Sequence, residues 1–323
     1  MAGVLTKEYF HDEAAAFAEL ESIVWPNGPI CPKCGSVERI GKLEGVKDKK
    51  GRVRHGLKKC YACRSQFTVR VGTVFESSHI PLHLWLQAAF LMMGSKKGVS
   101  ANQLHRALGI TLKSAWFVAH RLREAMKSTG GLFGTGGGMV EVDETFIGQD
   151  PEKAHLPARK GAHHKLKVLS LVDRNSGRAR SFVVDDLKVA TILPILKANI
   201  APDATLMTDE ATRYAHMASA FGGRYSVNHV AGEYVSAANP AITTNNIEGF
   251  FSIFKRGMKG VYQHCAKKHL HRYLAEFDFR YSYRVKLGFN DEARTEAMLR
   301  GIVGKRLTYR LPRSRPSEAE KGA

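Results

Sequence analysis

Apolar residues in the stretch 243–259 recur at the three- and four-residue steps of a helix. The stripe consists of Ile247, Phe250, Phe251, Phe254 and Met258, and it predicts an amphipathic helix docked on a core. The other face carries Glu248, Ser252, Lys255 and Lys259 at the same spacing. Two interpretations fit this face. Glu248 either holds a metal beside bases that bind a phosphodiester, or completes a capping box with Asn245 as the N-cap.

The segment from residue 138 onward alternates between strand-like and helical patterns. Predicted strands cover 139–143, 164–172, 179–184 and 204–208, and predicted helices cover 189–199 and 211–221. The turn at Asp173–Gly177 makes the second and third strands a hairpin. Strands that alternate with helices after an initial hairpin predict an α/β sheet with helices packed over it.

The N-terminal segment begins with a predicted helix over residues 7–24, which Pro26 ends. Two Cys-x-x-Cys pairs follow, formed by Cys31, Cys34, Cys60 and Cys63, with short strand-like segments nearby. Each pair can direct two thiolates at one ion, and a site made of four thiolates is closed. The sequence therefore predicts a structural Zn²⁺ in a zinc ribbon. Cys265 stands apart and is interpreted as an ordinary free thiol.

Residues 79–127 have a helical composition, and Ser100–Arg123 reads as a capped helix, a turn at Gly109 and a second capped helix. This is the outline of a helix-turn-helix, and a small three-helix bundle would show it equally well. The second helix offers four candidates for a major groove, namely Lys113, His120, Arg121 and Arg123. A glycine-rich stretch, 128–138, predicts a domain boundary.

Charge changes the picture by pointing to a polyanionic partner. Among 323 residues, 49 Lys and Arg against 30 Asp and Glu give a formal charge of +19, which favours nucleic acid or an anionic membrane. No apolar run reaches the length of a membrane-spanning helix, and the N-terminus lacks a signal-peptide pattern, so we expect a cytoplasmic protein. The basic run 47–59 is either a solvated loop or a phosphate contact, and 305–323 is predicted to be a disordered basic tail.

Three acids from distant segments are candidates for one site. Asp143 is expected to end the first strand, Asp209 ends a later one, and Glu248 lies in the first turn of the helix. Ligands of open α/β sheets gather at strand ends, and such a triad suits two divalent cations. Each acid alone also fits a cap or a solvated strand end. Seven other acids compete for the role: Glu141, Glu144, Asp150, Asp185, Asp186, Glu210 and Glu233.

Three motifs resemble one family. They are GTVFESSHIPLHLW from Gly72, VDETFIG from Val142 and NNIEGFFSIFKRG from Asn245. From about residue 15 to about 285 the chain is similar to bacterial insertion-sequence transposases with a zinc ribbon and a DDE core, the insertion-sequence family fifteen-ninety-five. The resemblance implies an RNase H-like mixed sheet flanked by helices, preceded by a zinc ribbon and a helical, helix-turn-helix-like region.

The resemblance also implies roles for residues. Asp143, Asp209 and Glu248 would bind catalytic Mg²⁺ or Mn²⁺, and Lys255, seven residues after Glu248, matches the basic position of the DDE signature. Asn245 belongs to the same motif, and we expect it to contact DNA together with Lys255, Arg256 and Lys259. A loop with His155, His163, His164, Lys165 and Lys167 either touches DNA or is only solvated.

The implied activity is metal-dependent cleavage at transposon ends and transfer of the 3′ hydroxyl into target DNA, by a nucleoid-associated homodimer. Alternatives are a DNA-binding protein with a silent core and a nuclease that never joins strands. Expected domains are the ribbon with its helix over 1–76, a DNA-binding helical region over 77–130, a catalytic core over 138–288, and a C-terminal helix with its tail over 289–323.

Overall fold

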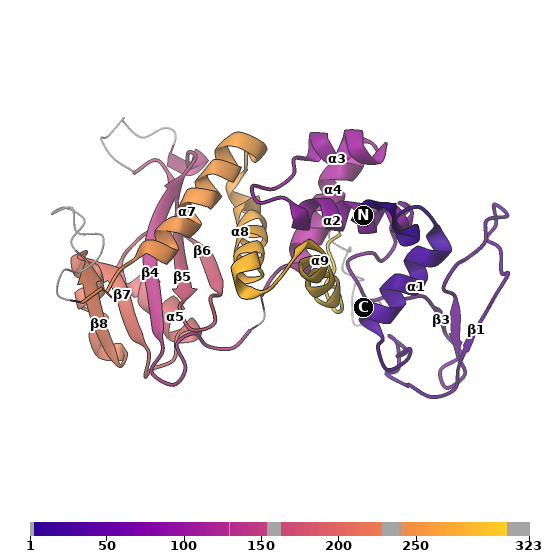
Figure 1. The fold of residues 1–323 in the computed structure, drawn as a ribbon, viewed down its shortest axis with the longest axis horizontal. Coiled ribbons are helices and arrows are strands. Elements are labelled where there is room, and N and C mark those ends of the chain that lie inside the picture. The colour runs from indigo at the N-terminus through magenta and orange to yellow at the C-terminus, as the bar shows by residue number, and fades with distance from the viewer. Residues whose placement is uncertain (1–2, 129, 154–162, 228–238, 241, 309–323) are drawn as a thin grey trace, which may run out of the picture.

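The computed structural model describes residues 3–128, 130–153, 163–227, 239–240 and 242–308. Figure 1 shows an α/β part at one end, a zinc-ribbon part at the other, and a group of helices between them. Helix α8 (Lys267–Ser282) lies between the sheet and this group of helices. In the described residues, none of the helices combines the length and the apolar character needed to span a bilayer.

One mixed sheet of five strands organises the α/β part. The strands are β4 (Met139–Ile147), β5 (Leu166–Asp173), β6 (Ala179–Val184), β7 (Thr205–Asp209) and β8 (Gly223–Val227). Their spatial order is β6-β5-β4-β7-β8. The pairs β6/β5 and β5/β4 are antiparallel, whereas β4/β7 and β7/β8 are parallel. This confirms the predicted RNase H-like mixed sheet flanked by helices, although the sequence patterns did not reveal β8.

Helices cover both faces of this sheet. On one face α5 (Val189–Asn199) packs on Val140 and Val142 of β4. On the other face lie α7 (Asn245–Gly257), its continuation as a π-helical turn (Met258–Tyr262), and α8. All five residues of the predicted apolar stripe of α7 are buried, as the helical period required. The predicted helix over 211–221 is shorter than expected, with α6 at Thr212–Ala215 and a 3₁₀ turn at Ala218–Ala220.

The middle helices share a second core. They are α1 (Glu13–Val24), α2 (Leu82–Gly94), α3 (Ala101–Leu108), α4 (Leu112–Ala125) and α9 (Asp291–Arg300). The predicted helix over 7–24 is divided, because Asp12 caps α1 by accepting a hydrogen bond from the Ala15 amide. The 3₁₀ turns Val4–Thr6 and Glu8–Phe10 precede α1. Elsewhere in the chain, Pro151–Lys153 and Val285–Leu287 also form 3₁₀ turns. The division into four domains remains a prediction.

Helices α3 and α4 form the capped pair that the sequence predicts. Ser100 and Gln103 make a capping box, Gly109 adopts a left-handed conformation with φ of 64°, and Thr111 caps α4. Three of the four candidates for a major groove, His120, Arg121 and Arg123, are not available to DNA, because their side chains are buried. Helix α4 packs on α3 and on α8, so this face is turned into the protein. Lys113, near the start of α4, is exposed.

The ribbon contains three short antiparallel strands. They are β1 (Ile40–Lys42), β2 (Lys58–Cys60) and β3 (Gln66–Phe67). The chain between β1 and β2 carries the basic run, where a bridge between Lys47 and Val53 narrows the loop. At the other terminus, Lys305 donates hydrogen bonds to the carbonyl oxygens of Ala125 and Lys127, so this first residue of the predicted tail is anchored. Residues 309–323 lie outside the described residues.

Candidate functional site

In the parallel half of the sheet, β4 and β7 pair over a short ladder and then separate, which leaves an opening between the two strands. Their ladder runs from Met139 with Thr205 to Glu141 with Met207, and β4 then continues along β5 as far as Ile147. Asp143 therefore lies in the middle of β4, opposite Ser170, and the prediction that it ends the strand is wrong. Asp209 is the last residue of β7, as predicted.

Three carboxylates meet at this opening. Asp143, Glu144 and Asp209 each contribute an oxygen atom, and these oxygens lie within 4.8 Å of one another. Asp143 Oδ1 accepts a hydrogen bond from the Glu144 amide at 2.7 Å, and Asp209 Oδ1 accepts one from the Ala211 amide at 3.0 Å. Asp209 does not cap α6, whose N-cap residue is Ala211, so its alternative role as a helix cap is not found, and its carboxylate reaches the cluster.

The electrostatics of the cluster call for a cation. Burial raises the pKa of Asp143 to about 7; the Glu144 amide opposes this shift, whereas the charges of Glu144, Asp209 and Glu248 add to it. Ionising Asp143 therefore places negative charges together in a partly buried site. Carboxylate oxygens are the ligands that Mg²⁺ and Mn²⁺ prefer, and a divalent cation would remove this repulsion. The donor set fits such an ion.

Glu144 is the member of the cluster that already has a counter-ion. Arg213 of α6 donates from Nε to Glu144 Oε1 at 2.8 Å and from Nη2 to Oε2 at 3.3 Å. This two-point contact uses both oxygens of Glu144. Asp143 and Asp209 are therefore better placed than Glu144 to bind a metal.

Glu248 approaches from α7 but does not belong to the group within 4.8 Å. Its charge nevertheless raises the pKa of Asp143. The capping box predicted for Asn245 and Glu248 does not form, because Thr244 is the N-cap residue and Asn245 is already the first residue of α7. Instead, Glu248 Oε1 accepts a hydrogen bond from the Thr244 hydroxyl at 3.0 Å.

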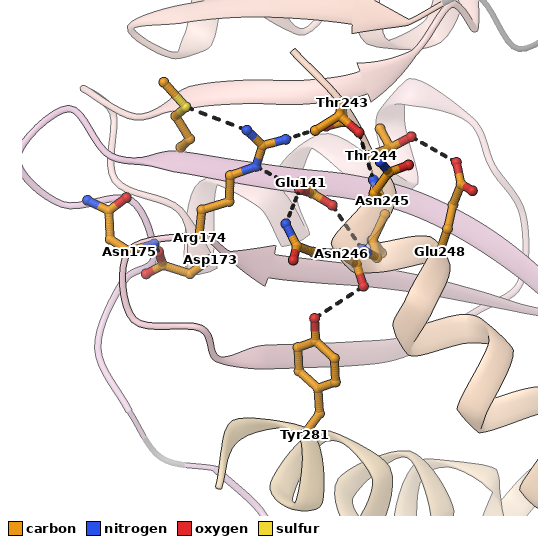
Figure 2. A network of polar contacts seen from close by, with 12 residues as sticks. Glu141, Asp173, Arg174, Asn175, Thr243, Thr244, Asn245, Asn246, Glu248 and Tyr281 are labelled. Carbon is orange, nitrogen blue, oxygen red and sulfur yellow. Dashed lines mark hydrogen bonds and ion pairs between the residues drawn. The ribbon is translucent and has the colours of Figure 1, made fainter. Parts of the chain in front are cut away.

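The N-terminus of α7 is held by Glu141 of β4, as Figure 2 shows. Glu141 is fully buried, and its Oε1 accepts from Arg174 Nε at 2.6 Å and from Asn246 Nδ2 at 2.8 Å. Its Oε2 accepts from the Ile247 amide at 2.8 Å. An acid from a distant strand therefore satisfies an amide in the first turn that the N-cap side chain leaves open.

This network fixes α7 relative to the acids. Arg174 also donates to the Thr243 carbonyl oxygen, and the Tyr281 hydroxyl of α8 donates to the Asn246 carbonyl oxygen at 3.2 Å. Glu141 and Asp143 are two positions apart on β4, so they share one face of the sheet. Sequence reasoning had placed Glu141 only among the competing acids. The available signal was a charge between Val140 and Val142 in an apolar strand, since a buried charge requires a partner.

The other competing acids have separate roles. Asp150 and Asp185 face Lys267, Asp186 accepts from the Lys188 amide, and Glu210 is exposed. Glu233 lies outside the described residues, as does His155 of the basic loop. In the remainder of that loop, His163 and Lys165 are exposed, His164 contacts the Lys153 carbonyl oxygen, and Lys167 belongs to β5.

Four residues of α7 and its continuation were expected to contact DNA. Asn245, Lys255, Arg256 and Lys259 are all exposed. Arg256 Nε also donates to the Ser252 carbonyl oxygen at 3.1 Å, which leans this side chain back along the helix. The opposite face of the helix is buried, so these polar groups are turned outward.

The four cysteines of the ribbon form a second candidate metal site. Their sulfur atoms lie within 4.8 Å of one another, and the distances Cys31 to Cys63 and Cys34 to Cys60 are both 3.7 Å. A tetrahedron with zinc–sulfur bonds of about 2.3 Å has edges of about 3.8 Å. The arrangement fits a closed structural zinc site. Cys265 lies elsewhere, at the end of the α7 continuation, as a free thiol.

Comparison with known proteins adds family information. Residues 136–282 match the ISXO2-like transposase domain, and residues 11–66 match the transposase zinc-ribbon domain. A relative described as an uncharacterized protein in transposable element ISH50 of Halobacterium salinarum is 26% identical over 291 residues, covering 84% of this chain and 91% of that protein.

Among solved structures, a chain of the simian T-cell lymphotropic virus intasome in complex with PP2A regulatory subunit B56 gamma has a TM-score of 0.27 and 14% identity. The match covers 60% of this protein and 65% of the chain in the intasome structure, which is slightly less than two thirds of that chain's length.

The Glu141 network generates a stability prediction. Glu141→Gln removes the charge that compensates Arg174, whose side chain is 15% exposed. Removing one partner of a buried ion pair should lower the free energy of unfolding by about 3 kcal/mol or more. The matched control is Glu210→Gln, an exposed acid, which should change it by less than about 0.5 kcal/mol. Urea denaturation followed by circular dichroism measures both, and equal shifts would contradict the role assigned to Glu141.

The cysteine cluster generates a second prediction. Cys60→Ser should reduce the zinc content of the purified protein from about one ion per chain to nearly none, because a structural zinc site needs all four of its thiolate ligands to hold the ion. Cys265→Ser is the control and should retain its zinc. Elemental analysis by mass spectrometry decides the matter, and undiminished zinc in Cys60→Ser would show that the metal is bound elsewhere.

Proposed function

Because this chain belongs to the insertion-sequence transposases that combine a zinc ribbon with a DDE core, we propose that it cleaves DNA at transposon ends and joins the freed 3′ hydroxyl to target DNA. The observation that supports the proposal is the cluster of carboxylates at the opening between β4 and β7. Asp143 and Asp209 come together there, and the charge of Glu248 acts on Asp143.

The proposed ligands of the catalytic metal are Asp143, Asp209 and Glu248, with Mg²⁺ or Mn²⁺ as the ion. Two such ions, when bound about 3.5 to 4 Å apart, would activate the attacking oxygen and stabilise the leaving oxygen of a phosphodiester. Thr244 orients Glu248 through its hydroxyl, and Glu141 positions the first turn of α7. Arg213 neutralises Glu144, which reduces the negative charge that DNA would meet.

The proposed DNA contacts are the exposed groups of α7 and its continuation. Lys255, Arg256 and Lys259 would bind backbone phosphates, and Asn245 would lie nearest the acids because it begins the helix. The basic run 47–59 of the ribbon would add phosphate contacts, consistent with the charge of +19. A partner of double-stranded DNA, both transposon ends and target, follows from this proposal.

The assembly and the location belong to the same proposal. Transposases generally act as oligomers that hold two transposon ends together, so we expect from the family a homodimer that acts in the cytoplasm at the nucleoid. The ribbon over 1–76 would bind DNA, and the helical region over 77–130 would do so through exposed groups such as Lys113 rather than through the buried face of α4. Residues 138–288 would carry the chemistry, and the α9 helix of 289–323 would join the helical core.

One observation favours a second candidate. Glu248 lies outside the group of oxygens within 4.8 Å, which is compatible with a DNA-binding protein whose core performs no chemistry. Such a protein would bind DNA without a divalent cation and would leave every strand intact.

The central test is substitution of Asp143. Asp143→Asn should lower the rates of strand cleavage and joining by at least about 100-fold, because loss of a metal ligand removes several kcal/mol of transition-state stabilisation. Labelled DNA carrying the element's ends reports cleavage as shorter products and joining as longer ones. Glu210→Gln, next to Asp209 and exposed, is the matched control and should remain active.

Unchanged cleavage and joining in Asp143→Asn would refute the proposed site. Binding of the same DNA by the native protein with no cleavage in Mg²⁺ or Mn²⁺ would favour the second candidate. Cleavage without longer products would identify a nuclease that does not join strands.

A further inference from the structure

Helix α3 turns a polar face away from the helical core. Leu104 and Leu108 are buried, whereas Asn102, Gln103 and Arg106 lie on the opposite side of the helix and are exposed. Figure 1 shows α3 at the upper border of the molecule, and the helices that it packs on are α4 and α2. In the described part of the chain, the outward face of α3 is therefore open to a partner.

Two side chains on this face have unused hydrogen-bonding groups. Asn102 and Arg106 form no side-chain hydrogen bond or ion pair within the described residues. Their neighbours are occupied, because Gln103 Oε1 accepts from the N-cap amide at 2.8 Å and the His105 ring contacts the Ile110 carbonyl oxygen. Asn102 and Arg106 are thus the groups of this face that are left for an external partner.

The charge along this part of the chain favours a polyanion. The sequence has no acid between Glu76 and Glu124, a stretch that includes all of α2 and α3. In the loop between these two helices, Lys96 and Lys97 are exposed. A surface with several bases and no acid of its own attracts the phosphates of nucleic acid.

The basic surface continues from α3 onto α7. The loop before α3 passes the end of α7 so closely that a Cβ on Gly257 would lie 2.6 Å from the Lys97 carbonyl oxygen. Arg256, next to Gly257, is exposed, and the sequence has no acid between Glu248 and Glu276. A duplex bound along α7 can therefore extend over Lys97 to α3.

The two unused side chains match base edges in a major groove. An Asn amide donates to and accepts from adenine at N7 and N6, and an Arg guanidinium donates two hydrogen bonds to O6 and N7 of guanine. Asn102 and Arg106 are four residues apart, which is about 6 Å along the helix axis. This distance corresponds to about two base-pair steps of about 3.4 Å, so both side chains can reach bases in one groove.

We propose that α3, rather than α4, reads base pairs in the major groove of double-stranded DNA. Asn102 binds an adenine, Arg106 binds a guanine about two base pairs away, and Lys97 binds a backbone phosphate between α3 and α7. The proposal rests on the proposed DNA binding of this chain, but it requires neither the catalytic metal nor strand joining.

The test begins with in vitro selection from a duplex library in which about 20 base pairs, or two helical turns, are randomised. No divalent cation is added, so that binding is measured without cleavage. The native protein should enrich one motif. Asn102→Ala should lose the preference for one adenine of this motif, and Arg106→Ala should lose the preference for one guanine about two base pairs away.

Fluorescence anisotropy then measures affinity for two duplexes, the selected one and one in which that guanine is replaced. Arg106→Ala should bind the selected duplex at least about fivefold more weakly than the native protein does, because one bidentate base contact is lost. On the duplex with the replaced guanine, Arg106→Ala and the native protein should have nearly equal affinities. A purely structural role of Arg106 would weaken binding to both duplexes alike.

Two lysine variants serve as matched controls. Lys97→Ala should weaken binding to both duplexes by the same factor and leave the motif unchanged, as expected for a phosphate contact. Lys197→Ala removes an equal charge from an exposed position on α5, across the sheet from α7, and should bind as the native protein does. The urea midpoints of all four alanine variants should agree with that of the native protein, because each altered side chain is exposed.

Three results would overturn the proposal. The first is a native protein that enriches no motif, and the second is an unchanged motif in both Asn102→Ala and Arg106→Ala. The third is an equal loss of affinity for both duplexes in Arg106→Ala, which would make Arg106 a phosphate contact only.

Failure of this inference can be told apart from failure of the proposed function. A native protein that enriches the motif but cleaves no DNA in Mg²⁺ or Mn²⁺ would refute the catalytic proposal and support base reading by α3. Cleavage and joining by the native protein, together with an unchanged motif in both α3 variants, would overturn base reading by α3 and support the catalytic proposal.

Discussion

The candidate site depends on the contacts of one buried carboxylate, that of Glu141. A fully buried acid is unfavourable unless it is paired, and here Arg174, Asn246 and the Ile247 amide pair it completely. These partners come from the turn that follows β5 and from the first turn of α7. Satisfying one charge therefore fixes two strands and a helix relative to one another, and Glu248 is carried on the fixed turn.

A second constraint acts beside the first, with the opposite sign. At the opening between β4 and β7, Asp143 and Asp209 come together, and no described basic side chain forms an ion pair with either of them, whereas Glu144 is neutralised by Arg213. The neighbouring acids push the pKa of Asp143 in the same direction as burial does. One carboxylate of β4 is thus fully paired within the protein, whereas the next one on the same face is the one for which we propose a metal. On this proposal, a single strand carries both a positioning group and a metal ligand.

Much of this arrangement could be predicted from the sequence where the signal is local. The stripe from Ile247 to Met258 fixed the buried face of α7, the caps at Ser100 and Thr111 predicted α3 and α4, and the cysteine spacing predicted their cluster. Long-range contacts defeated the other predictions. His120 and Arg123 looked available because helical period alone cannot reveal that α8 packs on that face. Asn245 looked like a cap because the sequence does not show that Glu141, 106 residues before Ile247, binds the Ile247 amide in the first turn. Asp143 lies within β4 because β5 prolongs the strand beyond its contact with β7.

The most direct test of the account is to locate Mn²⁺ in crystals of the protein by anomalous scattering. We expect a peak between the carboxylates of Asp143 and Asp209, with Glu248 rotated to complete the coordination and Glu141 still bound to Arg174. An ion held by Glu144 after displacement of Arg213, or no ion at the opened edge at saturating Mn²⁺, would contradict the division of roles between the acids of β4.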